Sequence, residues 1–161
     1  MAEPTLYLET TVVSYVVVRP SRDVVALARQ EITREWWTSR KDAFPIFVSP
    51  VVLEEAALGD PELARERLRV LDGFSILSAS PHVEQLAATY LAELYLPERA
   101  LRDAAHLAFA CSYGLDYLLT WNCAHIANAE VRRHLAQVNL RLGITTPTIC
   151  APEELFGKEA V

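Results

Sequence analysis

Five short apolar runs punctuate this chain, and longer stretches of mixed apolar and polar residues separate them. Each run is three to five residues long, and most contain β-branched or aromatic residues, which is typical of buried strands. The runs lie at residues 5–9, 46–49, 74–77, 117–120 and 148–150. Strands that alternate with helices along a chain build a parallel sheet covered by helices. The pattern therefore predicts an α/β protein with a central, mostly parallel sheet.

Proline, glycine and capping residues mark where the intervening helices begin and end. Asp60 and Ser80 each stand directly before a proline, as an N-cap before a first-turn proline does. Thr10 and Thr11 are expected to cap the first helix. The predicted helices cover residues 12–18, 24–40, 51–58, 62–71, 82–94, 98–113 and 126–142, with a last turn at 151–155. The second helix has its apolar residues at helical spacing, at Val24, Leu27, Ala28, Ile32 and Trp36.

Length and composition indicate one compact domain. The chain has 161 residues, of which 52% are hydrophobic, so it can bury a substantial core. We expect residues 1–156 to form a single domain and residues 157–161 a loose tail. The apolar runs are far shorter than the roughly 20 residues of a membrane span, and no signal-peptide pattern is evident. The three cysteines match no zinc or redox spacing, which favours reduced thiols in a cytoplasmic protein without membrane contact.

Acidic residues occur where predicted strands meet predicted helices. Glu9 ends the first strand, Glu54 and Glu55 follow the second, and Asp103 lies at the start of the helix that precedes the fourth. Asn122 comes directly after that fourth strand. In open α/β folds, functional sites gather outside the carboxyl ends of the parallel strands. These polar side chains, which are far apart in the sequence, are therefore expected to converge at one edge of the sheet.

Converging carboxylates indicate a metal site. Like charges in a partly desolvated cleft repel each other unless a cation neutralises them, and oxygen ligands suit Mg²⁺ or Mn²⁺. Such an ion can activate water and stabilise the charge that develops on a phosphate. The net charge of -6 argues against broad, sequence-independent nucleic-acid binding, which depends on many lysine and arginine contacts. It is compatible with a nuclease, because a bound cation restores local positive charge.

The order and context of these residues resemble the PIN-domain family, and in particular the VapC-like toxins of type II toxin–antitoxin systems. The resemblance rests on segments 7–11, 48–55, 103–110, 119–122 and 148–155, which follow the family's order along nearly the whole chain. It implies a three-layer α/β/α sandwich around a sheet of four to five strands. It also implies a Mg²⁺- or Mn²⁺-dependent endoribonuclease that cleaves RNA, forms a homodimer and is inhibited by a small antitoxin protein.

The resemblance also assigns roles to individual residues. The metal ligands that it implies are Glu9, Glu55 and Asp103. The catalytic set that it implies consists of the same three acids and Asn122. Further polar residues near these positions are expected to orient ligands or to face the substrate, namely Thr10, Thr120 and His125.

Two positions depart from the family's pattern. Glu9 stands where the family usually has aspartate, and Asn122 stands where it usually has a fourth acid. These departures leave an alternative open, in which a catalytically weakened PIN-like protein acts as a non-catalytic binding module. Glu54 and Glu55 point about 100° apart on a helix, so one of them faces the cleft, and the spacing from Ser49 favours Glu55.

The same acidic residues, and His106, also have interpretations in which they only stabilise the fold. Glu9 can simply cap the turn after its strand, and Asp103 can simply interact with the dipole at the start of its helix. His106 lies three positions after Asp103, on nearly the same helix face. We interpret His106 as a packed core histidine that is hydrogen-bonded to the backbone.

Overall fold

A computed structural model describes residues 2–157 and contains a single five-stranded sheet. The strands are β1 (Leu6–Leu8), β2 (Ile46–Val48), β3 (Ser75–Ile76), β4 (Tyr117–Leu119) and β5 (Thr148–Cys150). Their order across the sheet is β3-β2-β1-β4-β5, and every neighbouring pair is parallel. The predicted parallel sheet is confirmed, with five strands. Four of the strands are shorter than predicted: β1, β2 and β4 lack the polar residues at their ends, and β3 lacks Phe74 and Leu77.

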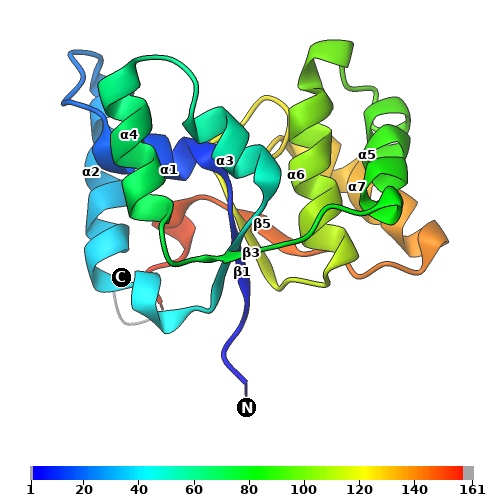
Figure 1. Cartoon of the computed structure of the whole chain (residues 1–161). Coiled ribbons are helices and arrows are strands. Elements are labelled where there is room, and N and C mark those ends of the chain that lie inside the picture. The colour runs from blue at the N-terminus through cyan, green and yellow to red at the C-terminus, as the bar shows by residue number, and fades with distance from the viewer. Residues whose placement is uncertain (1, 158–161) are drawn as a thin grey trace.

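Helices cover both faces of this sheet, as Figure 1 shows. On one side lie α1 (Thr10–Val17), α2 (Val24–Ser39) and α4 (Pro61–Leu71), with the short α3 (Pro50–Ala56) beside them. On the other side lie α5 (Pro81–Glu93), α6 (Leu101–Ser112) and α7 (Ala129–Leu142). Single 3₁₀ turns complete the structure, at η1 (Lys41–Ala43), η2 (Glu98–Ala100) and η3 (Pro152–Glu154). The arrangement is the predicted three-layer α/β/α sandwich.

Two helix boundaries differ from the prediction for identifiable reasons. The helix predicted over 98–113 is divided into η2 and α6, so Asp103 lies in the first turn of α6. The helix predicted over 126–142 starts only at Ala129, because the Asn128 side chain caps it through the backbone N–H groups of Glu130 and Val131. The residues before Asn128 instead form a turn that closes on the carbonyl of Asn122.

The buried face of α2 also differs from the apolar positions in the sequence. Val24 is 79% exposed and Leu27 is also exposed, whereas Gln30, Thr33 and Trp36 are buried. Polar contacts explain this choice. The Trp36 indole donates to the carbonyl of Leu155 at 3.1 Å, and the Thr33 hydroxyl accepts a hydrogen bond from the Trp121 indole at 2.8 Å. Satisfied polar groups can therefore occupy interior positions that an apolar pattern does not mark.

The strand order creates a topological switch point between β1 and β4. From β1 the chain builds outward through β2 and β3, and it then returns to place β4 and β5 on the other side of β1. Residues of β1 are fully buried, since helices cover both faces of this central strand. The crevice outside the carboxyl ends of β1 and β4 is the topological switch point, where ligands bind in open α/β sheets. Glu9 and Thr120 directly follow these two strands.

Other expectations from composition concern the cysteines, the membrane and the tail. Cys111 and Cys150 are buried, Cys123 is exposed, and all three are free thiols. Among the helices of residues 2–157, none is long and apolar enough to cross a membrane. The predicted loose tail begins at Gly157, and residues 158–161 lie outside the described part of the chain.

Candidate metal centre

Glu9 is held at the centre of the switch point by the end of β1. It is the N-cap of α1, which corrects the expected caps, since Thr10 and Thr11 already belong to the helix. One carboxylate oxygen, Oε2, accepts hydrogen bonds from the Thr11 backbone N–H at 3.1 Å, from the Thr11 hydroxyl and from the Thr120 hydroxyl at 2.7 Å. The side chain is only 2% exposed. Burial raises the pKa of Glu9, although the charge of His106 and these hydrogen bonds oppose that shift.

Glu55 reaches the same crevice from α3. The Ser49 hydroxyl caps this helix by accepting a hydrogen bond from the Val52 N–H, which sets the direction in which α3 leaves β2. Glu55 Oε1 accepts a hydrogen bond from the Thr10 hydroxyl at 2.8 Å and lies 2.6 Å from His106 Nε2. The structure therefore places Glu55 in the crevice, whereas Glu54 is exposed.

The pKa of Glu55 is lowered. Partial burial of the side chain by itself would raise this pKa, but the hydrogen bond and the charge of His106 outweigh burial. The pKa of His106 moves in the opposite direction. Burial would lower it, while the hydrogen bond to Glu55 and the charge of Glu9 raise it. The two shifts are consistent with each other, because both favour a negative charge on Glu55 and a proton on His106.

His106 is a member of the site that sequence reasoning assigned to the core. It is fully buried, as expected, but its ring nitrogens contact side chains and not the backbone, so that part of the prediction is wrong. Nδ1 is hydrogen-bonded to the Tyr7 hydroxyl at 2.6 Å, and that hydroxyl is hydrogen-bonded to Ser49 Oγ at 2.8 Å. Its spacing of three residues from Asp103 was the available signal, since the two share a helix face.

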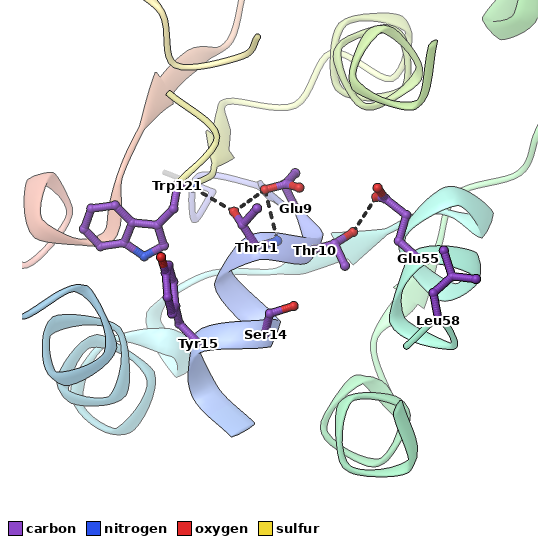
Figure 2. Close-up of a pocket in the computed structure, with 8 residues that line it drawn as sticks. All are labelled: Glu9, Thr10, Thr11, Ser14, Tyr15, Glu55, Leu58 and Trp121. Carbon is purple, nitrogen blue, oxygen red and sulfur yellow. Dashed lines mark hydrogen bonds between the residues drawn. The ribbon is translucent and has the colours of Figure 1, made fainter. Parts of the chain in front are cut away.

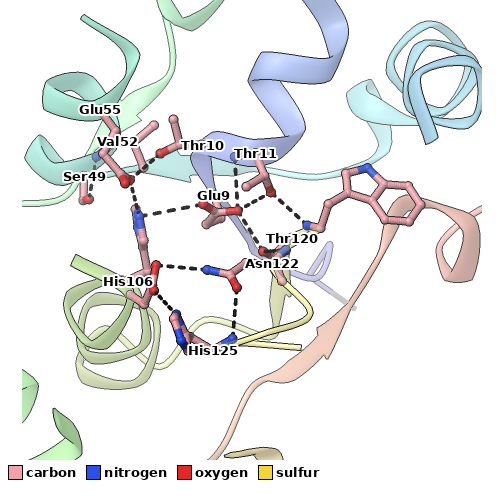
Figure 3. A network of polar contacts seen from close by, with 12 residues as sticks. Glu9, Thr10, Thr11, Ser49, Val52, Glu55, His106, Thr120, Asn122 and His125 are labelled. Carbon is pink, nitrogen blue, oxygen red and sulfur yellow. Dashed lines mark hydrogen bonds and ion pairs between the residues drawn. The ribbon is translucent and has the colours of Figure 1, made fainter. Parts of the chain in front are cut away.

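Glu9, Glu55 and His106 form a compact set of ligand atoms. One carboxylate oxygen from each acid and one ring nitrogen all lie within 4.8 Å of one another. Figure 3 shows these side chains pointing toward one another from the start of α1, from α3 and from α6. Two carboxylates and an imidazole are common ligands of divalent ions, and their separations allow one ion to contact all three. The donor set therefore fits a divalent cation.

Asp103 forms a second polar group beside this set. Its Oδ1 accepts a hydrogen bond from the Asn122 side-chain amide at 3.0 Å, and its Oδ2 lies 2.8 Å from His125 Nδ1. Asn122 also accepts a hydrogen bond from the His125 backbone N–H at 3.0 Å. Asp103 is thus brought together with Asn122 and His125, and it is outside the three-residue set, although its charge acts on His106. Figure 3 shows Asn122 and His125 next to the side chains of Glu9 and His106.

Two threonines connect the parts of the site. Thr120 is fully buried, and its hydroxyl donates to Glu9 while it accepts a hydrogen bond from the Asn122 backbone N–H at 2.9 Å. Thr10 donates to Glu55 from the first turn of α1. These contacts fix the carboxylates relative to the strands, which is the orienting role expected of such hydroxyls.

An open cleft leads to the carboxylates. Its volume is about 440 Å³, and its lining includes Glu9, Glu55, Ser14, Tyr15 and Trp121. Figure 2 shows the two acids on one side of the cleft and the two aromatic rings on the other. The Tyr15 and Trp121 rings meet edge to face with centroids 6.2 Å apart, and the Arg29 guanidinium lies 5.3 Å from the Trp121 ring. The cleft thus joins a carboxylate end to an aromatic end.

Replacing the buried charge of Glu9 is expected to stabilise the metal-free protein. All three hydrogen bonds to this side chain go to Oε2, so the oxygen of a glutamine can accept them while its amide takes the position of Oε1. Glu9→Gln removes a desolvated carboxylate next to Glu55, and we expect a gain of about 1 kcal/mol in the free energy of unfolding. Urea unfolding in the presence of EDTA measures this change. Lower stability of the variant would contradict the interpretation of Glu9 as a functional charge held at a cost.

Comparison with known proteins identifies the fold that carries this site. No family model and no curated protein matches the sequence. Its fold matches several solved structures, which include a VapC toxin and a VapBC complex. VapC20 of Mycobacterium tuberculosis, a toxin that cleaves the sarcin-ricin loop, has a TM-score of 0.59 at 16% identity, with 78% of this chain and 95% of that chain covered. VapBC2 from Rickettsia felis, bound to a DNA fragment from its promoter, has a TM-score of 0.51 at 15% identity, with 91% and 98% covered.

The chain has the PIN-like fold of the VapC toxins. The resemblance that was expected from short sequence segments is therefore confirmed at the level of the fold. The match spans nearly the whole length of both solved chains. Within this VapC-like fold, the sequence-predicted residues Glu9 and Glu55 meet at the switch point, while Asp103 and Asn122 pair beside them. His106, which lies between the two groups, is the member of the site to which the family resemblance assigned no role.

Proposed function

We propose that this protein is a metal-dependent endoribonuclease and the toxin of a toxin–antitoxin pair. The observation that carries the proposal is the convergence of Glu9, Glu55 and a ring nitrogen of His106 within 4.8 Å at the switch point of a VapC-like fold. Both carboxylates lie at the end of a cleft, so a bound ion there would be accessible to a substrate. VapC20, which has the same fold, cleaves RNA at the sarcin-ricin loop.

In this proposal the acidic residues hold Mg²⁺ or Mn²⁺. When bound, such an ion supplies an activated water and neutralises the charge that develops on the phosphate in the transition state. Glu9 and Glu55 bind the ion, and Thr10, Thr11 and Thr120 keep their carboxylates in place. The hydrogen bonds that Thr11 and Thr120 donate to Oε2 leave the other oxygen of Glu9 directed at the site.

Asp103 completes the acidic set in this proposal. Asn122 and His125 hold its two oxygens from opposite ends of one short turn, so the carboxylate cannot rotate freely. A carboxylate with this orientation can bind the ion or orient the attacking water, and the imidazole of His125 can donate to a phosphate oxygen or to Asp103. Asn122 contributes no charge, but it maintains the position of Asp103.

The aromatic end of the cleft fits a single-stranded RNA substrate. Bases that are splayed out of a helix stack on aromatic rings, and arginine adds a cation–π or phosphate contact. Tyr15 and Trp121 line the end of the cleft that faces away from α3, and the Arg29 guanidinium lies over the Trp121 ring. We further propose a small antitoxin as partner and a homodimer as the working form in the cytoplasm, since VapBC2 of the same fold is named as a complex that binds its promoter.

A metal titration tests the proposed function. We expect Mn²⁺ at millimolar concentration to raise the melting temperature of the protein, because an ion that binds only the folded state stabilises it by mass action. At 100 times the dissociation constant the gain is about 2.7 kcal/mol. Cleavage of single-stranded RNA should require the ion and stop when EDTA is added. Glu9→Gln is the matched variant in which both the stabilisation and the cleavage should be lost.

A non-catalytic binding module remains a second candidate, and one observation favours it. His106 already gives Glu55 a close ionic partner, and within residues 2–157 no buried side-chain polar atom lacks a hydrogen bond. A site satisfied in this way can persist without metal. The titration separates the two candidates, because a binding module would show neither a melting shift nor cleavage at millimolar Mn²⁺.

A further inference from the structure

The candidate metal centre contains one nitrogen ligand among oxygen ligands. His106 Nε2 lies 2.6 Å from Glu55 Oε1 and 3.9 Å from Glu9 Oε1, so it occupies the space between the two carboxylates. The ring comes from α6, on the opposite side of the sheet from α1. The identity of this ligand determines which ions the site can hold.

The buried contacts behind His106 fix the nitrogen that faces the acids. Nδ1 is hydrogen-bonded to the Tyr7 hydroxyl, which is hydrogen-bonded to Ser49 Oγ, and all three side chains are buried. Hydroxyl groups can both donate and accept. When Nε2 binds a cation, Nδ1–H can donate to Tyr7 while Tyr7 donates to Ser49. When Nε2 also carries a proton, as in the ion pair with Glu55, Nδ1–H can still donate to Tyr7, because both nitrogens of an imidazolium are donors. The chain of contacts therefore satisfies His106 in either state.

This arrangement has the features of a metal-ligating histidine. Such a residue normally uses its second ring nitrogen in a hydrogen bond that fixes the tautomer and the ring orientation. The edge-to-face packing of Tyr7 and His106, with ring centroids 5.7 Å apart, restricts the ring further. One ring nitrogen is thus held by a buried hydroxyl, while the other faces the carboxylates of Glu55 and Glu9.

We propose that His106 is a direct ligand of the metal and that it makes the centre selective for a first-row transition ion over Mg²⁺. This inference rests on the proposed metal site. Imidazole is a borderline ligand that suits transition ions, whereas Mg²⁺ prefers oxygen ligands and keeps several of its waters. Two carboxylates with one imidazole therefore favour Mn²⁺, and Co²⁺ or Zn²⁺ still more, over Mg²⁺. An all-carboxylate site would discriminate much less between Mn²⁺ and Mg²⁺.

Calorimetric titrations of the full-length protein with Mn²⁺ and with Mg²⁺, at one pH, test this inference. We expect Mn²⁺ to bind at least about 10-fold more tightly than Mg²⁺. His106→Gln replaces the nitrogen by an amide that can offer oxygen, so Mn²⁺ should bind about 100-fold more weakly and the preference over Mg²⁺ should disappear. Tyr7→Phe keeps the ligand but removes the contact that orients it, and a loss of about 10-fold is expected.

Pulsed electron paramagnetic resonance of bound Mn²⁺ gives a second readout that does not depend on the affinity for the metal. In protein labelled with ¹⁵N-histidine, a directly coordinated nitrogen should appear as a hyperfine coupling. His125→Asn is the matched control, because His125 is the other histidine of the site but contacts Asp103 and not the two glutamates. The coupling should persist in His125→Asn and vanish in His106→Gln, provided that far-ultraviolet circular dichroism shows both variants folded.

The outcomes separate this inference from the proposed function. Tight Mn²⁺ binding with the nitrogen coupling supports His106 as a ligand. Metal binding of equal strength for Mn²⁺ and Mg²⁺, or binding without a nitrogen coupling in the unaltered protein, overturns the inference and leaves a metal-dependent nuclease possible. Binding of neither ion overturns both. If His106→Gln fails to fold, a coupling that persists in His125→Asn still assigns the coordinated nitrogen to His106, because His125 is then excluded.

Discussion

Glu55→Gln is expected to lower the rate of RNA cleavage by about 10³-fold while the fold is retained, since removal of one preorganised electrostatic group typically costs 10²–10³-fold. The glutamine oxygen can still accept the hydrogen bond from Thr10, so α3 keeps its contact with α1. The variant loses the negative charge that would hold the cation. The measurement is single-turnover cleavage of a fluorescent RNA with saturating Mn²⁺, together with thermal melting of the metal-free variant.

Glu54→Gln is the matched control for this experiment. The two glutamates are adjacent on α3, and the same change in charge occurs in both variants, but Glu54 is exposed and stands outside the ligand set. Cleavage by Glu54→Gln should remain within about twofold of the unaltered protein, because exposed charges contribute little. Equal losses in the two variants would mean that overall charge, and not the ligand position, controls the reaction.

Asp103→Asn is expected to reduce cleavage by about 10²-fold, again with the fold retained. The new side chain can keep both contacts, because its oxygen can accept from the Asn122 amide while its amide donates to His125 Nδ1. This second contact requires only that His125 moves its proton to the other ring nitrogen. What is lost is the negative charge, so a large fall in activity without a fall in melting temperature would assign a catalytic role to that charge.

Asp116→Asn provides the comparison at the opposite end of the sheet. Asp116 accepts hydrogen bonds from the backbone N–H of Thr5 at 2.8 Å and from its hydroxyl at 3.0 Å, near the amino ends of β1 and β4. It undergoes the same chemical change but lies away from the switch point, so cleavage should be unaffected. Normal cleavage by Asp103→Asn would instead remove Asp103 from the proposed mechanism.

The existence and order of the elements could be predicted from local sequence. Each strand is a short run of apolar residues, and the helix starts at Pro61 and Pro81 follow capping residues that act within one turn. Such signals depend on neighbours in the sequence, so they can be recognised without knowledge of the fold. The parallel sheet followed from the alternation of strands and helices. The boundary at Asn128 was missed although its cap is local, since the Asn128 side chain accepts hydrogen bonds from the N–H groups of Glu130 and Val131.

The buried face of α2 could not be predicted from the spacing of apolar residues. The exposed Val24 and the buried Gln30 both run against the rule that apolar residues are inside. Gln30 is satisfied because its side-chain oxygen accepts a hydrogen bond from the backbone N–H of Ser21 at 3.0 Å. A polar residue becomes acceptable in the interior only when such a partner is supplied, and the sequence does not show the partner.

For this protein, the sequence by itself determined the fold class and the elements that carry the acids, because the alternation of strands and helices and the capping signals act between near neighbours in the chain. Only the tertiary structure decided which acids meet. Glu9 and Glu55 face His106, while Asp103 turns to Asn122, and these pairings join residues 19 to 97 positions apart. Distance and direction in space depend on how β1, α3 and α6 pack together, which no local pattern encodes. The ligand that sets the expected metal preference, His106, was therefore visible only in the folded chain.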